Sequence, residues 1–256
     1  MSEQSTPRNT EAAAPVHDVA VLGGGSFGTA MAKVLGENGH RVHFWMRGKA
    51  QAEEILSTRI NSRYMPGIKL TGDIQPTTDL ADAVSKAEIV FVAIPSKAFR
   101  AVIRENSDKF RDEQIVISLT KGIEEHGFKL MSEILQEEIP RCRTGVLSGP
   151  NLAKEIVEQK FTGTVIASPD SELCQTVQSA LSCDYFRVYD NPDIYGVELG
   201  GALKNIYAVA SGMAAAIGVG ENSRSFLITR ALAEMSRFAV ELGANPMTFL
   251  GLSGVG

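Results

Sequence analysis

The sequence has few cysteines and histidines, no excess of basic residues and no apolar run long enough to span a membrane. Its 256 residues include three cysteines without a CxxC pair and four histidines without HxxE or HxxxH spacing. Basic residues number 25 against 30 acidic ones, which gives a net charge of -5. These shortages predict free thiols in the cytoplasm, no metal site, no nucleic-acid partner and no stable membrane insertion.

Two segments of unusual composition do not change this expectation. Residues 1–15 are polar, rich in alanine and proline, and lack an apolar core, so they predict a disordered tail and not a signal peptide. Residues 206–219 are the most apolar stretch, but they are too few to span a bilayer. We therefore expect a buried helix there, with residues 213–217 in the core. His43 lies in an apolar run and is expected to be a structural histidine.

The first two thirds of the chain alternate between strand and helix patterns. An apolar run over residues 17–22 enters a glycine turn, helical spacing follows from Phe27, and a second apolar run covers residues 41–46. This order is typical of a right-handed βαβ unit. Further buried strands are expected at residues 89–94, 115–119 and 144–147. The pattern predicts an α/β fold in which a doubly wound, Rossmann-type parallel sheet forms a dinucleotide-binding domain over residues 16–190.

Beyond the predicted sheet the strand signals stop. Asn191 and Pro192 indicate a helix start, with the asparagine as N-cap and the proline at the first helical position. Residues 195–217 and 225–242 have the pattern of two long helices. We therefore expect a second, all-helical substrate domain over residues 191–256. Because the chain ends inside a predicted turn, this domain is expected to be incomplete.

The glycine turn has the spacing of a phosphate-binding loop, Gly23-x-Gly25-x-x-Gly28. Gly23 permits the tight turn, Gly25 lets a pyrophosphate approach the backbone, and Gly28 lets the helix pack against the sheet. The amides of Ser26 and Phe27 would face the phosphates at the positive end of the helix. Because the motif follows a strand and opens a helix, it predicts a dinucleotide site.

The end of the second strand bears on the choice of cofactor. An acidic residue at this position holds the ribose 2′-hydroxyl of NAD, whereas an arginine suits the 2′-phosphate of NADP. This chain has Arg47 there, followed closely by Lys49. The sequence therefore favours NADP as cofactor, and NAD is the alternative if Arg47 is only a solvated surface side chain.

One lysine stands out in the second domain. Lys204 lies in an apolar, glycine-rich helix, where an ammonium group is costly to desolvate unless it faces a cleft. Such a lysine has a lowered pKa, which suits it to proton transfer. Lys121 and Asn151 follow predicted strands, and they could converge with Lys204 and Asn205 at the sheet edge where ligands bind. Glu198 shares a helix face with Asn205, which leaves a structural contact and a catalytic role equally open.

Six segments of the chain carry a family resemblance. They are GGGSFGTA at 23–30, VAIPS at 92–96, SLTKGIE at 118–124, LSGPNLAKE at 147–155, GVELGGALKN at 196–205 and GLSGVG at 251–256. Together they resemble the bacterial-type NAD(P)-dependent glycerol-3-phosphate dehydrogenases, over nearly the whole chain from residue 19. The glycine motif is common to many dehydrogenases, whereas the lysine-bearing and Ser-Gly-Pro segments in this order are far more specific.

The resemblance implies roles for individual residues and a reaction. Lys204 would be the catalytic lysine. The substrate would be bound by Lys121, Gly149, Asn151, Lys204 and Asn205. The cofactor would be bound by Gly23, Gly25, Ser26, Phe27, Gly28, Arg47, Lys121 and Ala153. The implied reaction is the reversible, NAD(P)H-dependent reduction of dihydroxyacetone phosphate to sn-glycerol 3-phosphate for phospholipid synthesis, with a phosphorylated small molecule and a second copy of the chain as expected partners.

Members of that family continue past GLSGVG with an active-site aspartate and then with an arginine and an asparagine that bind the substrate phosphate. This sequence stops before both, so we expect it to bind cofactor but to turn over poorly. Two alternatives are kept. One is a related β-hydroxyacid or ketopantoate-type dehydrogenase, and the other is a non-catalytic dinucleotide-binding protein.

Overall fold

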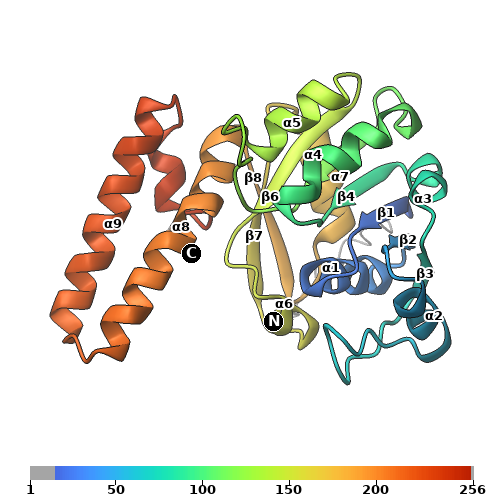
Figure 1. Ribbon diagram of the computed structural model, residues 1–256, viewed down its shortest axis with the longest axis horizontal. Coiled ribbons are helices and arrows are strands. Elements are labelled where there is room, and N and C mark those ends of the chain that lie inside the picture. Colours follow the sequence, from blue (N-terminus) through green and yellow to red (C-terminus); the bar gives the residue numbers. More distant parts are fainter. Residues whose placement is uncertain (1–14, 255–256) are drawn as a thin grey trace, which may run out of the picture.

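The computed structural model describes residues 15–254, and in these residues a helix-covered sheet lies beside a pair of long helices (Figure 1). Of the tail predicted over residues 1–15, all but Pro15 lies outside the described residues, as do Val255 and Gly256 of the last motif.

The sheet has eight strands in the order β3-β2-β1-β4-β5-β6-β7-β8. The strands are β1 Asp18–Leu22, β2 Arg41–Trp45, β3 Asp73–Thr77, β4 Ile89–Val92, β5 Ile115–Ser118, β6 Arg143–Ser148, β7 Thr162–Ala167 and β8 Phe186–Asn191. Neighbouring strands pair in parallel, and only β6 and β7 pair antiparallel. The order reverses direction at β1, as it does in doubly wound folds. This confirms the predicted fold class.

Helices cover both faces of the sheet (Figure 1). They are α1 Ser26–Glu37, α2 Lys49–Thr58, α3 Leu80–Lys86, α4 Ser96–Glu105, α5 Met131–Glu138, α6 Ala153–Val157 and α7 Ser171–Leu181, with a short 3₁₀ helix η1 Ser107–Lys109. Successive strand residues point to opposite faces. Val19 and Val21 pack in a core with α1, α2, α6 and α7, whereas Ala20 and Leu22 pack in a second core with α3, α4 and α5. Burial on both faces explains the continuous apolar strands of the sequence.

The remaining described residues form α8 Ile194–Ala216, α9 Glu221–Glu241 and the 3₁₀ helix η2 Pro246–Leu250. The first half of α8 lies against β6 and η2, and two glycines make this approach possible. A Cβ on Gly201 would lie 2.3 Å from Ser148 Oγ, and one on Gly200 would lie 3.0 Å from the carbonyl oxygen of Ser253. The glycines therefore fix how closely α8 can bring its later residues to the sheet.

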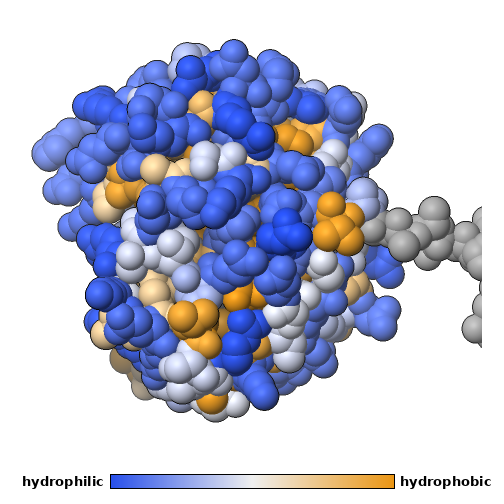
Figure 2. Space-filling view, turned by 90° about the vertical axis from the view of Figure 1, so that its right-hand side faces the viewer, coloured by the Kyte–Doolittle hydropathy of each residue, from blue (hydrophilic) through white to orange (hydrophobic). Residues whose placement is uncertain are grey.

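Two expectations about α8 are wrong. The helix begins with Asp193 as N-cap, whose side chain accepts a hydrogen bond from the amide of Gly196, while Asn191 is the last residue of β8. The second half of α8 is not buried, since Ile206, Met213 and Ile217 are 62%, 65% and 80% exposed. The buried residues of α8 all lie before Ala202, because only that half reaches the sheet. By contrast, the face near β3 is mostly hydrophilic, with scattered apolar side chains (Figure 2).

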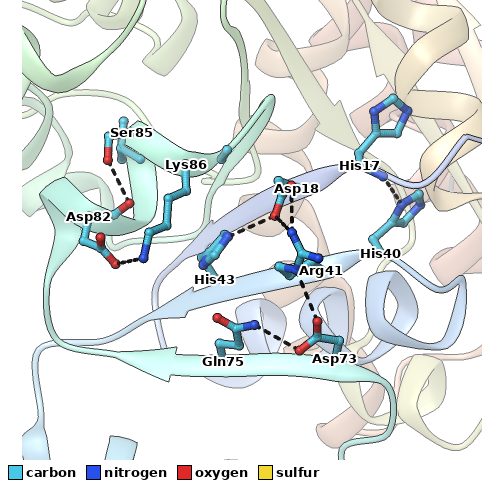
Figure 3. A network of polar contacts seen from close by, with 12 residues as sticks. His17, Asp18, His40, Arg41, His43, Asp73, Gln75, Asp82, Ser85 and Lys86 are labelled. Carbon is cyan, nitrogen blue, oxygen red and sulfur yellow. Dashed lines mark hydrogen bonds and ion pairs between the residues drawn. The ribbon is translucent and has the colours of Figure 1, made fainter.

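The amino ends of β1, β2 and β3 carry a polar network (Figure 3). Asp18, Arg41 and Asp73 are in register across these three strands. The Arg41 guanidinium lies 3.0 Å from Asp18 Oδ1 and 3.4 Å from Asp73 Oδ2. His43 is buried and its Nε2 lies 3.3 Å from the same Asp18 oxygen. His43 thus has a structural hydrogen-bond partner, as predicted from its apolar surroundings.

Candidate functional site

The glycine turn between β1 and α1 forms the floor of the first part of the site. Gly23 has a φ of +128°, and a Cβ there would lie 2.3 Å from the carbonyl oxygen of Ala93. A Cβ on Gly28 would lie 1.9 Å from the carbonyl oxygen of Gly23, so both positions need glycine for packing. Gly25 differs, because its Cβ would point into open space. It is also the N-cap of α1 and gives the helix no side-chain cap, which leaves first-turn amides available to an anion.

Side chains outside the motif hold this turn in place. Gln51 Nε2 and Asn61 Nδ2 both donate to the carbonyl oxygen of Gly24, at 2.6 Å and 3.1 Å. Asn61 is fully buried and also donates to Thr29 Oγ1 at 2.7 Å. Neither residue belongs to a sequence motif, and only the fold of the segment after α2 brings Asn61 to the turn, so both were absent from the predicted site.

A cleft of about 570 Å³ opens above the turn, at the carboxyl ends of the strands. Six of the predicted cofactor residues line it: Gly23, Gly25, Ser26, Phe27, Arg47 and Lys121. Two lining residues had no signal in the sequence, Arg63 and Tyr64, and the Arg63 guanidinium lies 5.4 Å from the centre of the Tyr64 ring. The cleft therefore has two arginines, Arg47 and Arg63, at the β2 end, where a dinucleotide would place its adenosine half.

A second cavity of about 450 Å³ adjoins the first. All five predicted substrate residues line it: Lys121, Gly149, Asn151, Lys204 and Asn205. Its other walls are mostly apolar side chains of α8 and α9, a contribution that the sequence analysis missed. Lys121 lines both cavities, so it marks their junction.

Two predicted cofactor residues lie outside the lining of both described cavities. Gly28 packs beneath the turn against Gly23. Ala153 begins α6 and packs against the core beside α1. Both residues support the walls of the cleft, and their contact with the cofactor stays a prediction.

Two ammonium groups meet at the junction of the cavities. Lys121 Nζ and Lys204 Nζ both donate to the carbonyl oxygen of Gly149, at 3.2 Å and 3.0 Å. Burial and, to a smaller extent, the charge of Lys121 lower the pKa of Lys204 to about 8. Lys121 is exposed as a residue, but burial of its amino end also lowers its pKa. A lysine with a pKa near 8 can donate or accept a proton near neutrality.

Asn151, which lines the same cavity, is anchored by its side-chain amide. Its Nδ2 donates to Thr164 Oγ1 at 2.9 Å, and the Thr164 hydroxyl in turn donates to the carbonyl oxygen of Ser148 at 3.2 Å. Asn151 Oδ1 is buried and has no hydrogen-bond partner among the residues that the structure describes. A buried polar atom of this kind is matched by a ligand or by ordered water.

Glu198 does not contact Asn205, which is exposed and lines the cavity. The Glu198 side chain turns away from the site, is buried, and accepts hydrogen bonds from the amide and the hydroxyl of Ser132 at the start of α5. Burial, partly offset by these hydrogen bonds, raises the pKa of Glu198 to about 7. The residue thus fastens α8 to the sheet domain.

Residues 15–254 contain no helix with the length and apolar composition that a membrane span requires. Within the same residues, no three or more histidine, cysteine, aspartate or glutamate side chains are grouped to hold a metal ion.

The chain matches two family models. The N-terminal model of NAD-dependent glycerol-3-phosphate dehydrogenase matches residues 18–174, and the C-terminal model matches residues 193–256. A glycerol-3-phosphate dehydrogenase [NAD(P)+] of Alcanivorax borkumensis is 70% identical over 94% of this chain and 70% of its own length. One from Pseudomonas fluorescens is 59% identical over 93% of this chain and 70% of its own length. The crystal structure of a glycerol-3-phosphate dehydrogenase from Coxiella burnetii superposes with a TM-score of 0.89 at 34% identity, over 94% of this chain and 74% of that chain.

Proposed function

This chain belongs to the NAD-dependent glycerol-3-phosphate dehydrogenase family, and from that premise we propose how its described residues perform the reaction. The activity is the NAD(P)H-dependent reduction of dihydroxyacetone phosphate to sn-glycerol 3-phosphate, so the protein is an oxidoreductase. The observation that carries the proposal is the pair of lysine ammonium groups that meet at Gly149, where the dinucleotide cleft joins the second cavity.

The first cleft fits a dinucleotide. Gly25 leaves open the space that a pyrophosphate needs, and the first-turn amides of Ser26 and Phe27 would donate to it. Arg47 and Arg63 lie at the adenosine end, and Lys121 at the end next to the second cavity. When bound, the reduced nicotinamide supplies the hydride for the reaction. The protein's part is to place that ring beside Lys121.

The second cavity would hold the ketone. Lys204, as an ammonium, would donate a hydrogen bond to the carbonyl oxygen at C2 and then transfer its proton as negative charge develops there. Lys121 contributes a second positive charge at the same point, which lowers the pKa of Lys204 and so makes this proton easier to release. Asn151 and Asn205, which line the same cavity, would orient the substrate.

We propose NADP as the preferred form of the cofactor, because two arginines and no described carboxylate line the adenosine end of the cleft. NADPH and NADH titrations of the wild-type chain and of Arg47→Gln, followed by fluorescence, measure this preference. Tighter NADPH binding that Arg47→Gln abolishes is the expected result. Equal affinities in the wild type, or tighter NADH binding, would contradict the proposal.

The decisive experiment follows the nicotinamide absorbance of the purified chain with three substrates. Dihydroxyacetone phosphate and ketopantoate are ketones and are tested for oxidation of NADPH. The alcohol 3-hydroxyisobutyrate is tested for reduction of NADP+. Turnover of dihydroxyacetone phosphate alone is expected. Activity on either acid without activity on the phosphate ester would establish the alternative dehydrogenase. Bound NADPH without turnover of any of these substrates would favour the dinucleotide-binding protein. Slow turnover by this 256-residue chain stays a prediction, and the same assay measures it.

The setting of the enzyme is part of the proposal. A role in phospholipid synthesis is supported by the product, which is the backbone of glycerophospholipids. The three described cysteines, Cys142, Cys174 and Cys183, are free thiols, which agrees with a cytoplasmic location. A homodimer and a domain boundary near residue 191 are also retained as proposals, to be tested by light scattering and by limited proteolysis.

A further inference from the structure

We propose that Thr164 is a positioning residue that fixes the side-chain amide of Asn151, so that Asn151 Oδ1 accepts a hydrogen bond from a substrate hydroxyl. The assignment of that hydroxyl to the substrate rests on the proposed function. Neither the motifs nor the charge pattern of the sequence indicates a role for Thr164, which lies in the middle of β7.

The direction of two hydrogen bonds determines which end of the Asn151 amide is left without a partner. The Thr164 hydroxyl has one proton, and it is donated to the carbonyl oxygen of Ser148 at 3.2 Å. The hydroxyl oxygen can then only accept, and its partner at 2.9 Å is Asn151 Nδ2. With the NH₂ end held in this way, the carbonyl end is the one that remains for a ligand.

The surroundings make this orientation rigid. Thr164 is fully buried, and Asn151 Oδ1 is buried without a partner among the described residues. A Cβ on Gly149 would lie 3.1 Å from the Cα of Thr164, so β7 packs directly beneath the segment that carries Asn151. A change at Thr164 is therefore transmitted to the cavity through one side chain.

The chemistry of Asn151 Oδ1 determines which substrate group it can bind. An amide oxygen only accepts, so it binds a group with a proton to donate. Dihydroxyacetone phosphate has one such group, the hydroxyl on C1, while its carbonyl and phosphate oxygens are acceptors that the lysines would serve. A site built to hydrogen-bond a hydroxyl discriminates strongly against the analogue that lacks it. Thr164 would thus set specificity for the dihydroxy compound over its 1-deoxy analogue, hydroxyacetone phosphate.

The test compares the wild type with Thr164→Val, which removes the hydroxyl at nearly constant shape, and with Thr164→Ser, which restores it. Thr162→Val is the matched control, because Thr162 is a buried threonine of the same strand whose hydroxyl donates to the carbonyl oxygen of Lys160. We would measure kcat and KM for both ketones, and NADPH affinity as a check that the fold is intact.

We expect Thr164→Val to reduce the discrimination between the two ketones by on the order of 10- to 100-fold, mainly by lowering kcat/KM for the dihydroxy substrate. Thr164→Ser and Thr162→Val should keep the wild-type ratio and NADPH affinity. An unchanged ratio in Thr164→Val would overturn the inference.

A second readout does not depend on turnover. The side-chain NH₂ of Asn151, assigned by its loss in Asn151→Asp, should exchange slowly with solvent in the wild type and in Thr164→Ser, and faster in Thr164→Val. The two readouts test different claims. A wild type that failed to reduce dihydroxyacetone phosphate would contradict the proposed function. Equal exchange rates in the wild type and in Thr164→Val would contradict the positioning role of Thr164, whereas faster exchange in the variant would support that role even without turnover.

Discussion

The amino and carboxyl ends of the parallel strands carry opposite arrangements of charged side chains. At the amino edge, the Arg41 guanidinium lies between the carboxylates of Asp18 and Asp73, and the hydrogen bond to Asp18 raises its pKa (Figure 3). At the carboxyl edge, the ammonium groups of Lys121 and Lys204 share one neutral carbonyl oxygen, and both have lowered pKa values.

The difference shows how one sheet separates structure from chemistry. At the amino edge, the carboxylates favour the charged form of Arg41, and an exposed network of this kind adds little to stability. At the carboxyl edge, burial of both ammonium groups, together with the charge of Lys121 beside Lys204, makes a proton easier to release. This is costly for folding but useful for catalysis. Substitution of either lysine should therefore change the activity, whereas substitutions in the amino-edge network should change neither the activity nor the stability.

The largest effect is expected at Lys204. Lys204→Met removes the proton donor while keeping the stem of the side chain, and it should lower kcat by roughly 10²- to 10⁴-fold. NADPH affinity should be unchanged, because Lys204 does not line the cofactor cleft. Lys160→Met is the matched control, since Lys160 is a surface lysine paired with Glu158. If Lys204→Met kept its activity, another group at the carboxyl edge would have to donate the proton.

A second comparison separates two glycines of the turn. Gly25→Ala places a methyl group in the open space of the cradle, so NADPH affinity should fall by roughly 10- to 100-fold with little change in Tm. Gly28→Ala forces a contact with the Gly23 carbonyl oxygen, so Tm should fall as well. Thermal unfolding with and without NADPH distinguishes the two. A lower Tm for Gly25→Ala would mean that this position is also needed for packing.

The pH dependence should report the lysine pair. Reduction needs the protonated form of Lys204, so kcat/KM should be level below about pH 8 and fall about tenfold per unit above it, while oxidation rises through the same range. In Lys121→Met the like charge is gone, so the falling limb should move to higher pH even if the rate is low. If the falling limb of Lys121→Met stayed at the same pH as in the wild type, Lys121 would not be a cause of the lowered pKa of Lys204.

The smallest effect is expected at the amino edge. Arg41→Met breaks the exposed ion pairs with Asp18 and Asp73, and it should leave kcat and NADPH affinity unchanged and Tm nearly so. Kinetics and thermal unfolding at low and high salt measure both quantities. If activity fell with this variant, the separation between the two edges would be false.

Local patterns determined most of the fold. Apolar runs located β4, β5 and β6, helical spacing located α1 and α9, and the glycine motif located the turn between β1 and α1. Each of these rests on residues close together in the chain, so periodicity alone could reveal them. The start of α8 was misplaced because Asn191, Pro192 and Asp193 are all suitable cap residues, and pairing of β8 with β7 extends the strand through Asn191.

What only the tertiary structure decided concerns contacts between distant segments. The positions of Lys121 and Asn151 after predicted strands indicated that they could share a crevice with Lys204. Their meeting at Gly149 depends on the close approach of α8 to β6 at Gly201. Burial along α8 and the hydrogen bonds of Thr164 were hidden for the same reason. Composition and periodicity predict the helix or strand to which a residue belongs and the face on which it lies. Its hydrogen-bond partners, its solvent exposure and its pKa depend on residues from distant parts of the chain.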